Sequence, residues 1–204
     1  MVLAAGAGER FGQRKQFLKL GGVRLVDHSV ETMSRVCAGL VLVLPSGSLW
    51  DGRSVDDVVE GGATRIDSAS QGLAAVPPDV QLILVHDAAH PLAPTSLMES
   101  LIEAVRQEGV DAALPVLPTR DTVMRVEGDR VVETIPRRGL VTVQTPQAFR
   151  ANVLRRAHER GGDASDDSVL VQRMGANIKL VAGDPRNIHI ATKEDLAMAE
   201  RLCR

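Results

Sequence analysis

The sequence predicts one α/β domain built on an open, mostly parallel, twisted sheet with helices on both faces. Three observations support this prediction. The length of 204 residues suits a single hydrophobic core, because such cores stop growing near roughly 250 to 300 residues. Hydrophobic residues make up 44% and charged residues 25% of the chain, as in an ordinary globular protein. Short apolar runs alternate with amphipathic segments up to residue 116, so we expect residues 1–204 to form one domain.

The first half of the chain alternates predicted strands and helices. Met1 falls inside the first expected strand, so we expect the natural start to lie slightly upstream. Residues 40–44 are apolar throughout, as in a parallel strand buried on both faces. Thr95 or Ser96 is expected to cap a helix, since Ser96 and Glu99 have capping-box spacing. The expected elements are strand 2–5, helix 26–36, strand 40–44, helix 67–75, strand 81–85, a helix from 95 or 96, and strand 112–116.

A predicted β-hairpin interrupts this alternation. Residues 122–126 and 130–134 are short β-prone segments around Glu127-Gly128-Asp129. An isolated two-stranded hairpin is marginal in water, so we expect this protruding arm, residues 119–140, to pack on a partner. The remaining expected elements are a β-like segment 140–144, helix 150–159, a helix starting at Ser165 with Asp166 and Asp167 in its first turn, strand 178–181, and a last helix capped by Thr192.

Composition and charge exclude several classes of protein. The balance of 24 Lys and Arg against 26 Asp and Glu argues against binding nucleic acid or an anionic membrane by counterion release. Aromatic residues, at 2%, are too few for base-stacking platforms. The longest apolar run is far shorter than the roughly 20 residues that span a bilayer. Cys37 and Cys203 form neither a disulfide framework nor a thiolate zinc site, which fits a reducing cytoplasm.

Three segments that follow expected strands are candidates for ligand binding, because ligands of open α/β sheets lie beyond the carboxyl ends of strands. In the loop 6–15, small residues let backbone amides approach an anion, although the loop matches neither a Walker A nor a dinucleotide-binding motif. Asp87 offers a carboxylate for a divalent cation on a phosphate substrate, or a helix N-cap. Thr145 and Gln147 stand at a predicted strand-to-helix junction, where they bind a ligand or serve as capping and turn residues.

These segments belong to a longer series of motifs that covers essentially the whole chain. In order, the motifs are Ala4-Ala5-Gly6-Ala7-Gly8-Glu9-Arg10 with Lys15-Gln16, Gly61-Gly62 with Arg65 and Ser68, His86-Asp87-Ala88-Ala89, Asp121-Thr122, Gln144-Thr145-Pro146-Gln147, and Asn187-Ile188 before Glu194-Asp195-Leu196. Their order and spacing resemble those of the 2-C-methyl-D-erythritol 4-phosphate cytidylyltransferases. The resemblance implies a Rossmann-like, nucleotide-diphospho-sugar transferase-like fold and a homodimer formed through the hairpin arm.

The resemblance also implies an activity. Such an enzyme transfers CMP from CTP to 2-C-methyl-D-erythritol 4-phosphate, giving 4-diphosphocytidyl-2-C-methyl-D-erythritol and pyrophosphate for non-mevalonate isoprenoid synthesis, and it requires Mg²⁺. The acceptor phosphate is already an anion, so the site needs alignment and positive charge rather than a general base. Catalytic roles would fall on Arg10, Lys15, Arg137 and His189. CTP would be bound by Ala4, Ala5, Gly6, Ala7, Gly8, Gly62, Ser68, Asp87 and Ala88. The acceptor would contact Asp87, which also holds the metal, together with Thr122, Arg137 and Thr145.

The sequence departs from the family in its acceptor half. His90 and His189 stand where the family has an arginine and a lysine, and a neutral imidazole holds an anion less firmly than a lysine. The arm arginine is Arg137 or its neighbour Arg138. The alternatives are a cytidylyltransferase for another polyol phosphate or a phosphonate, a non-catalytic CTP-binding homologue, and a nucleotide-sugar pyrophosphorylase, for which the chain is short. His158 and the neighbouring arginines are expected on a solvated helix face.

Overall fold

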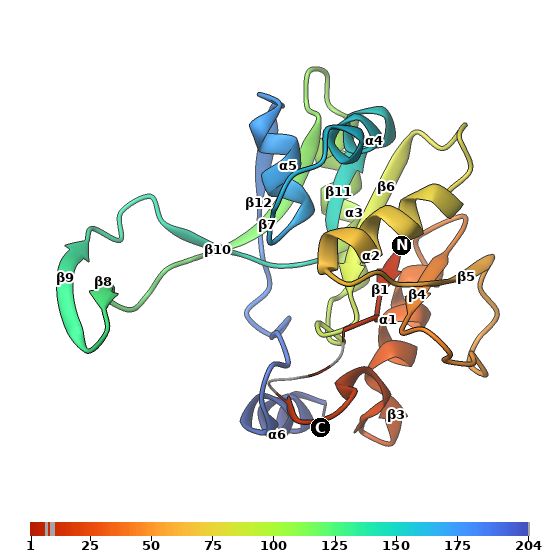
Figure 1. Ribbon diagram of the computed structural model, residues 1–204, viewed down its shortest axis with the longest axis horizontal. Coiled ribbons are helices and arrows are strands. Elements are labelled where there is room, and N and C mark those ends of the chain that lie inside the picture. The colour runs from red at the N-terminus through yellow and green to blue at the C-terminus, as the bar shows by residue number, and fades with distance from the viewer. Residues whose placement is uncertain (7, 9–10, 204) are drawn as a thin grey trace.

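The computed structural model describes residues 1–6, 8 and 11–203. A central sheet carries helices on both faces, which confirms the predicted fold class (Figure 1). The strand order across the sheet is β10-β7-β11-β6-β1-β4-β5, and β12 pairs with β7. These strands are β1 (Val2–Leu3), β4 (Val41–Leu44), β5 (Asp57–Glu60), β6 (Leu82–Asp87), β7 (Ala112–Pro118), β10 (Val141–Val143), β11 (Gln147–Arg150) and β12 (Ile178–Ala182).

The sheet is mixed, with a parallel half and an antiparallel insertion. Strand β1 lies between β4 and β6, parallel to both, and β5 continues the parallel half beyond β4. Strand β11 runs antiparallel to both β6 and β7. Strand β12 is parallel to β7, while β10 is antiparallel to it. The carboxyl ends of β1 and β6 therefore meet at one edge, where ligands of such sheets bind.

Alternate residues of the buried strands face two separate hydrophobic cores. In β4, Val41 and Val43 belong to the core under α2 (Arg65–Ala75), α4 (Ala151–Arg160) and α5 (Asp167–Arg173). Leu42 and Leu44 belong to the core under α1 (Leu25–Ser34) and α3 (Thr95–Arg106). This period of two explains why residues 40–44 are apolar throughout, because both faces of the strand are covered.

A third, smaller cluster supports the segment that carries Lys15. Phe11, Leu20, Leu25, Ile190 and Ala199 pack together beneath the sheet edge. They come from the loop before the 3₁₀ turn η2 (Lys15–Phe17), from β2 (Lys19–Leu20), which pairs with β3 (Val23–Arg24), from the start of α1, and from α6 (Lys193–Leu202) and the segment before it. Leu18, directly after η2, packs against the same cluster. The amino-terminal loop and the last helix are thus packed on each other.

The second hairpin, β8 (Val123–Glu127) with β9 (Arg130–Ile135), projects from the body of the molecule (Figure 1). Apolar side chains on it are exposed, namely Met124, Val126, Val131 and Val132. Among the described residues, no helix is long and apolar enough to cross a membrane.

Several local expectations are wrong. Residues 147–150 form strand β11 rather than a helix junction, and β5 was missed. The cap of α3 is Pro94, without a side-chain hydrogen bond, so neither Thr95 nor Ser96 caps that helix. Helix α5 begins at Asp167, with Asp166 as its cap, because the Asp166 carboxylate accepts from the Ser168 N–H. The predicted Thr192 cap of α6 is confirmed, with Asp195 completing a capping box.

Candidate active site

A cavity of about 340 Å³ opens at the carboxyl ends of β1 and β6, beside the amino end of α2. It is lined by Leu3, Ala4, Ala5, Gly6, Lys15, Gln16, Gly62, Ala63, Thr64, Arg65, Ser68, Asp87, Ala88, Ala89 and His189. A larger cavity, about 500 Å³, lies at the amino ends of the same strands and is mostly apolar. Because the smaller one gathers charged groups where α/β sheets bind ligands, it is the candidate active site.

The loop after β1 forms one wall of this cavity. The Gln16 side chain donates a hydrogen bond to the Gly6 carbonyl at 3.1 Å. Gly8 has φ +74°, and a Cβ there would lie 1.8 Å from the Gln13 carbonyl oxygen, so only glycine fits. The Lys15 ammonium donates to the Ile190 carbonyl at 2.7 Å, which holds its charge at the cavity. The predicted residues Ala7 and Arg10 lie outside the described residues.

The turn before α2 forms the opposite wall. A Cβ at Gly61 would lie 2.2 Å from the Ala5 Cβ and 2.8 Å from the Ser68 hydroxyl oxygen. A Cβ at Gly62 would lie 2.3 Å from the Asp67 Cβ. Both glycines therefore permit a close approach between this turn, the loop after β1 and the first turn of α2. The result is a closely packed surface of backbone and small side chains on this side of the cavity.

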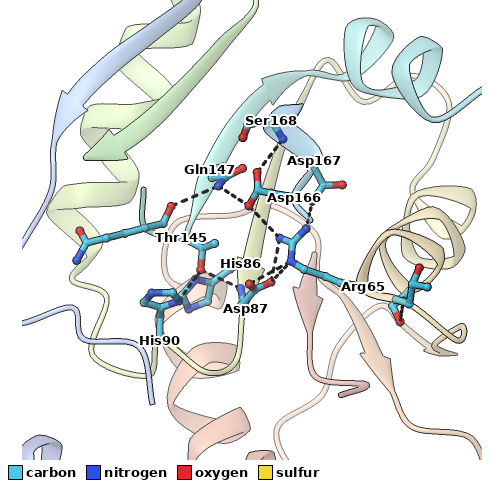
Figure 2. Close-up of polar contacts among 12 residues, drawn as sticks. Arg65, His86, Asp87, His90, Thr145, Gln147, Asp166, Asp167 and Ser168 are labelled. Carbon is cyan, nitrogen blue, oxygen red and sulfur yellow. Dashed lines mark hydrogen bonds and ion pairs between the residues drawn. The ribbon is translucent and has the colours of Figure 1, made fainter. Parts of the chain in front are cut away.

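Asp87, at the end of β6, is paired with Arg65 of α2 (Figure 2). Arg65 Nε lies 3.2 Å from both carboxylate oxygens of Asp87, and Nη2 lies 3.1 Å from Oδ1. The same guanidinium donates from Nη1 to Asp167 Oδ2 at 2.6 Å. Burial alone would lower the pKa of Arg65, but the carboxylates of Asp87, Asp167 and Asp166 raise it above its ordinary value. Arg65 therefore stays charged.

A buried group of histidines lies behind Asp87. Thr145 Oγ1 accepts from the Asp87 backbone N–H at 3.0 Å and lies 3.3 Å from His86 Nδ1 and 3.1 Å from His90 Nδ1. The hydroxyl has one proton to donate, so one imidazole accepts it and the other donates to Thr145. Burial lowers the pKa of His86 and of His90 to about 3. The amino terminus adds to this at His86, and His86, His189 and Lys15 add to it at His90, where Asp87 acts in the opposite direction. The His90 ring lies 5.0 Å from that of His189 at the cavity wall.

Some of the predicted site residues line the cavity and others lie away from it. Within the described part of the molecule, Ala4, Lys15, Ser68 and Asp87 line the cavity, as do several of the predicted small residues. Thr145 is buried behind Asp87 instead. Thr122 and Arg137 are exposed on the segments that lead into and out of the projecting hairpin, and they are not among the residues that line the cavity. Arg137 donates to the carbonyl of Arg120.

The expectation of a solvated helix face is wrong for His158 and Arg155, while Arg156 and Arg160 are exposed as expected. The His158 side chain is 5% exposed, and its Nε2 lies 2.8 Å from Asp167 Oδ1. Burial alone would raise the pKa of Asp167, but His158 and Arg65 lower it. Arg155 donates to the carbonyl of Leu73 in the last turn of α2 and to those of Val76 and Pro77 just after it. The sequence held a signal, because His158 is four residues after the core residue Leu154 and thus on the same helix face.

The side chains present suit a cation that is shared with a phosphate ligand. Among the described residues, no group of three or more His, Cys, Asp or Glu side chains is placed to hold a metal ion. Asp87 supplies one carboxylate at the cavity, with its side chain 23% exposed. Mg²⁺ is typically held by one or two carboxylates together with substrate phosphates and waters, so Asp87 fits this kind of site.

Comparisons with known proteins give a consistent result. A family model described as IspD, 2-C-methyl-D-erythritol 4-phosphate cytidylyltransferase, matches residues 1–204. The enzyme of that name from Geobacillus thermodenitrificans is 37% identical over 219 residues, which cover 99% of this chain and 95% of the relative. A bifunctional enzyme IspD/IspF from Granulibacter bethesdensis is 39% identical, but this chain spans only 55% of its length. The crystal structure of the cytidylyltransferase from Thermus thermophilus matches with a TM-score of 0.86 and 38% identity, covering 100% of this chain and 98% of that one.

Proposed function

Because the chain belongs to the 2-C-methyl-D-erythritol 4-phosphate cytidylyltransferase family, we propose that it transfers CMP from CTP to 2-C-methyl-D-erythritol 4-phosphate. The products are 4-diphosphocytidyl-2-C-methyl-D-erythritol and pyrophosphate, in the pathway to isoprenoid precursors. The observation that carries the proposal is the cavity at the carboxyl ends of β1 and β6, where Lys15 and Asp87 face one space. The free cysteines Cys37 and Cys203 support a reducing, cytoplasmic setting.

The reaction is an in-line displacement at the α-phosphorus of CTP. An oxygen of the acceptor phosphate forms a bond to that phosphorus, while the bond to the β-phosphate oxygen breaks and pyrophosphate leaves with the electron pair. The attacking group is an anion, so the site needs no base. Lys15, and Arg10 by the family match, would stabilise the charge that develops on the triphosphate. Asp87 would hold Mg²⁺, which would supply further positive charge to the triphosphate.

The walls of the cavity support a nucleotide orientation. The surface formed by Ala5, Gly62 and Ser68, with Gly61 packed behind Ala5 and Ser68, would hold the cytosine and ribose through backbone groups and the serine hydroxyl. Gly6 and Gly8 would place backbone amides near the triphosphate. Lys15 then lies on the phosphate side of the nucleotide. This orientation brings the α-phosphorus toward Asp87 and His189.

The acceptor half is proposed to need a second copy of the chain. We infer that the arm, residues 119–140 of the single domain 1–204, packs on a partner and carries Thr122 and Arg137 to the partner's cavity. Two observations support this: both residues are exposed away from their own cavity, and the arm exposes Met124, Val126, Val131 and Val132. Exposed apolar side chains on a projecting hairpin are typical of an interface.

The identity of the acceptor is the part of the proposal that most needs a test. The His189 ring at the cavity wall lies 5.0 Å from the ring of the buried His90, and the two stand in place of the lysine and arginine that the family resemblance implies. This observation favours a second candidate, a cytidylyltransferase for another polyol phosphate. Removing cationic groups weakens phosphate binding and leaves more of the recognition to hydroxyl contacts.

The experiment is a pyrophosphate-release assay with CTP, ATP, UTP and GTP against a panel of polyol phosphates. We expect turnover with CTP and 2-C-methyl-D-erythritol 4-phosphate above every other pair. If another acceptor is turned over about tenfold faster, that acceptor replaces 2-C-methyl-D-erythritol 4-phosphate as the proposed substrate, and the proposed transfer of CMP is kept. Binding of CTP in calorimetry without turnover on any acceptor would reject the enzymatic proposal in favour of a nucleotide-binding homologue.

A further inference from the structure

Arg65 connects the candidate metal ligand to an acidic pair on a different helix. It is the first residue of α2, and its side chain is 25% exposed. On one side it faces both carboxylate oxygens of Asp87 at 3.2 Å. On the other side it donates to Asp167 at 2.6 Å and lies 3.8 Å from Asp166. Figure 2 shows this guanidinium between the end of β6 and the start of α5.

The acidic pair is itself fixed by side chains from elsewhere in the chain. Asp167 is fully buried, and its other oxygen lies 2.8 Å from His158 Nε2. Asp166 accepts from the Gln147 amide at 2.9 Å and from the Ser168 backbone N–H at 2.8 Å. Every carboxylate oxygen that faces Arg65 from this side therefore belongs to a group held by β11, α4 or α5. Asp166 and Asp167, which we call the anchor, are therefore held in place by groups other than Arg65.

Charge keeps the arginine at this anchor. Asp167 has no exposure to water, so moving Arg65 away would leave a buried carboxylate without its cation, a change that is strongly destabilising. The guanidinium fork is planar, so an arginine fixed at Asp167 also fixes the plane in which it meets Asp87. Each carboxylate oxygen has further lone pairs, and those that Arg65 does not use remain for the cavity.

We propose that Arg65 is a positioning residue, which holds the Asp87 carboxylate against the Asp166–Asp167 anchor so that its remaining lone pairs face the cation shared with the nucleotide. The proposal rests on the metal-binding role of Asp87 proposed above. It predicts that the orientation of Asp87, and not only its charge, sets the affinity for the cation. Partners that orient metal-ligating carboxylates typically contribute about 10- to 100-fold in metal affinity.

The test substitutes Arg65→Lys, which keeps the positive charge for Asp167 but removes the planar fork. Mn²⁺ binding is titrated by electron paramagnetic resonance with saturating CTP, and CTP binding is measured by calorimetry in EDTA. We expect the Mn²⁺ dissociation constant to rise about 10-fold or more. The CTP dissociation constant without metal, and the KM for CTP measured at saturating Mn²⁺, should stay within about threefold of wild type.

Arg155→Lys is the matched control. Arg155 is also a partly buried arginine, on α4, but its partners are the carbonyls of Leu73, Val76 and Pro77 rather than carboxylates. This substitution should lower the melting temperature and leave the Mn²⁺ dissociation constant within about twofold of wild type. If Arg65→Lys lowers the melting temperature and weakens metal-free CTP binding as much as it weakens Mn²⁺ binding, Arg65 is a structural residue and the proposal is overturned.

Asp87→Asn separates failure of this proposal from failure of the proposed function. Unchanged Mn²⁺ binding in Asp87→Asn would remove the metal role of Asp87 itself. Loss of Mn²⁺ binding in Asp87→Asn, with wild-type binding in Arg65→Lys, would overturn only the positioning role. If Arg65→Lys does not fold, Asp167→Asn loosens the anchor while Arg65 stays in place; we expect a smaller rise, about threefold, and no change would equally overturn the proposal.

Discussion

Replacing Gly61 with alanine should distort the surface that is proposed to hold the nucleoside. The added Cβ would lie 2.2 Å from the Ala5 Cβ and 2.8 Å from the Ser68 hydroxyl oxygen. Carbon atoms in contact normally stand about 3.5 to 4.0 Å apart, so the two walls must separate by more than about 1 Å. Overpacking of this kind costs about 1 to 3 kcal/mol of the free energy of unfolding. Displacement of Ala5 also moves the backbone groups that would hold cytosine.

The measurements are urea denaturation for stability and calorimetry for CTP binding. We expect Gly61→Ala to lose about 1 to 3 kcal/mol of stability and to bind CTP about 10-fold or more weakly, since each 1.4 kcal/mol is about a factor of ten. Gly39→Ala is the matched control, because a Cβ there meets only Asp56 at 3.5 Å, an ordinary contact. It should keep CTP affinity and stability within about 1 kcal/mol of wild type. If Gly61→Ala binds CTP as the control does, the close approach at Gly61 does not shape the nucleotide site.

Three further predictions concern Lys15 and the groups behind Asp87. Lys15→Ala should slow pyrophosphate release about 10²- to 10³-fold, and a rate within about twofold of wild type would remove its role. Thr145→Val should cost about 1 to 3 kcal/mol in urea denaturation, because the Asp87 N–H loses its buried acceptor; a smaller loss than in an exposed Thr→Val variant would contradict this. His86 and His90 have pKa values lowered to about 3, so the unfolded chain binds more protons below its ordinary histidine pKa. Stability should therefore be full above about pH 6.5 and fall as the pH drops toward 3, most clearly between about pH 6.5 and 4.5, before the carboxylates titrate. The fall should be shallower in His90→Gln, and an equal slope would show that His90 is not the buried neutral group.

Strands β1, β4 and β6 of the parallel half were predictable because buried strands follow simple rules, whereas the mostly exposed strand β5 was missed. A strand covered on both faces must be apolar throughout, which made residues 40–44 easy to recognise, and helix α3 repeats apolar residues at helical spacing. Strand β11 was missed because its four residues begin with glutamine and include one large apolar side chain, Phe149. It is a strand because β6 and β7 leave a gap between them that an antiparallel segment fills, and that gap is a property of the whole sheet.

The candidate site, like the sheet, has parts that the sequence predicts and parts that it does not. Asp87 was predictable, because it directly follows a buried strand and such positions gather at one edge of the sheet. Its partnership with Arg65 was not, because the residues that fix this arginine come from three further elements. Asp167 lies 102 positions from Arg65 along the chain and receives its second partner, His158, from another helix. Local sequence patterns indicate which face a residue occupies but not which charged group meets it across a core.

His90 and His189, which replace the arginine and lysine that the family resemblance implies, are neighbours and therefore act as one structural change rather than two. Their rings lie 5.0 Å apart, so two permanently charged side chains at these positions would repel each other unless an anion lay between them. His90 is instead buried, with its pKa lowered to about 3 by burial and by its neighbours, and is neutral near pH 7. At least one of the cations that the family resemblance implies is therefore absent from this chain's own cavity. The proposed phosphorylated acceptor would then depend more on arginine from elsewhere, and the exposed Arg137 on the arm of a second copy is the group proposed to supply it. It follows that Arg137→Ala should raise the KM for the acceptor far more than the KM for CTP; an equal rise in both would argue that the arm serves assembly alone.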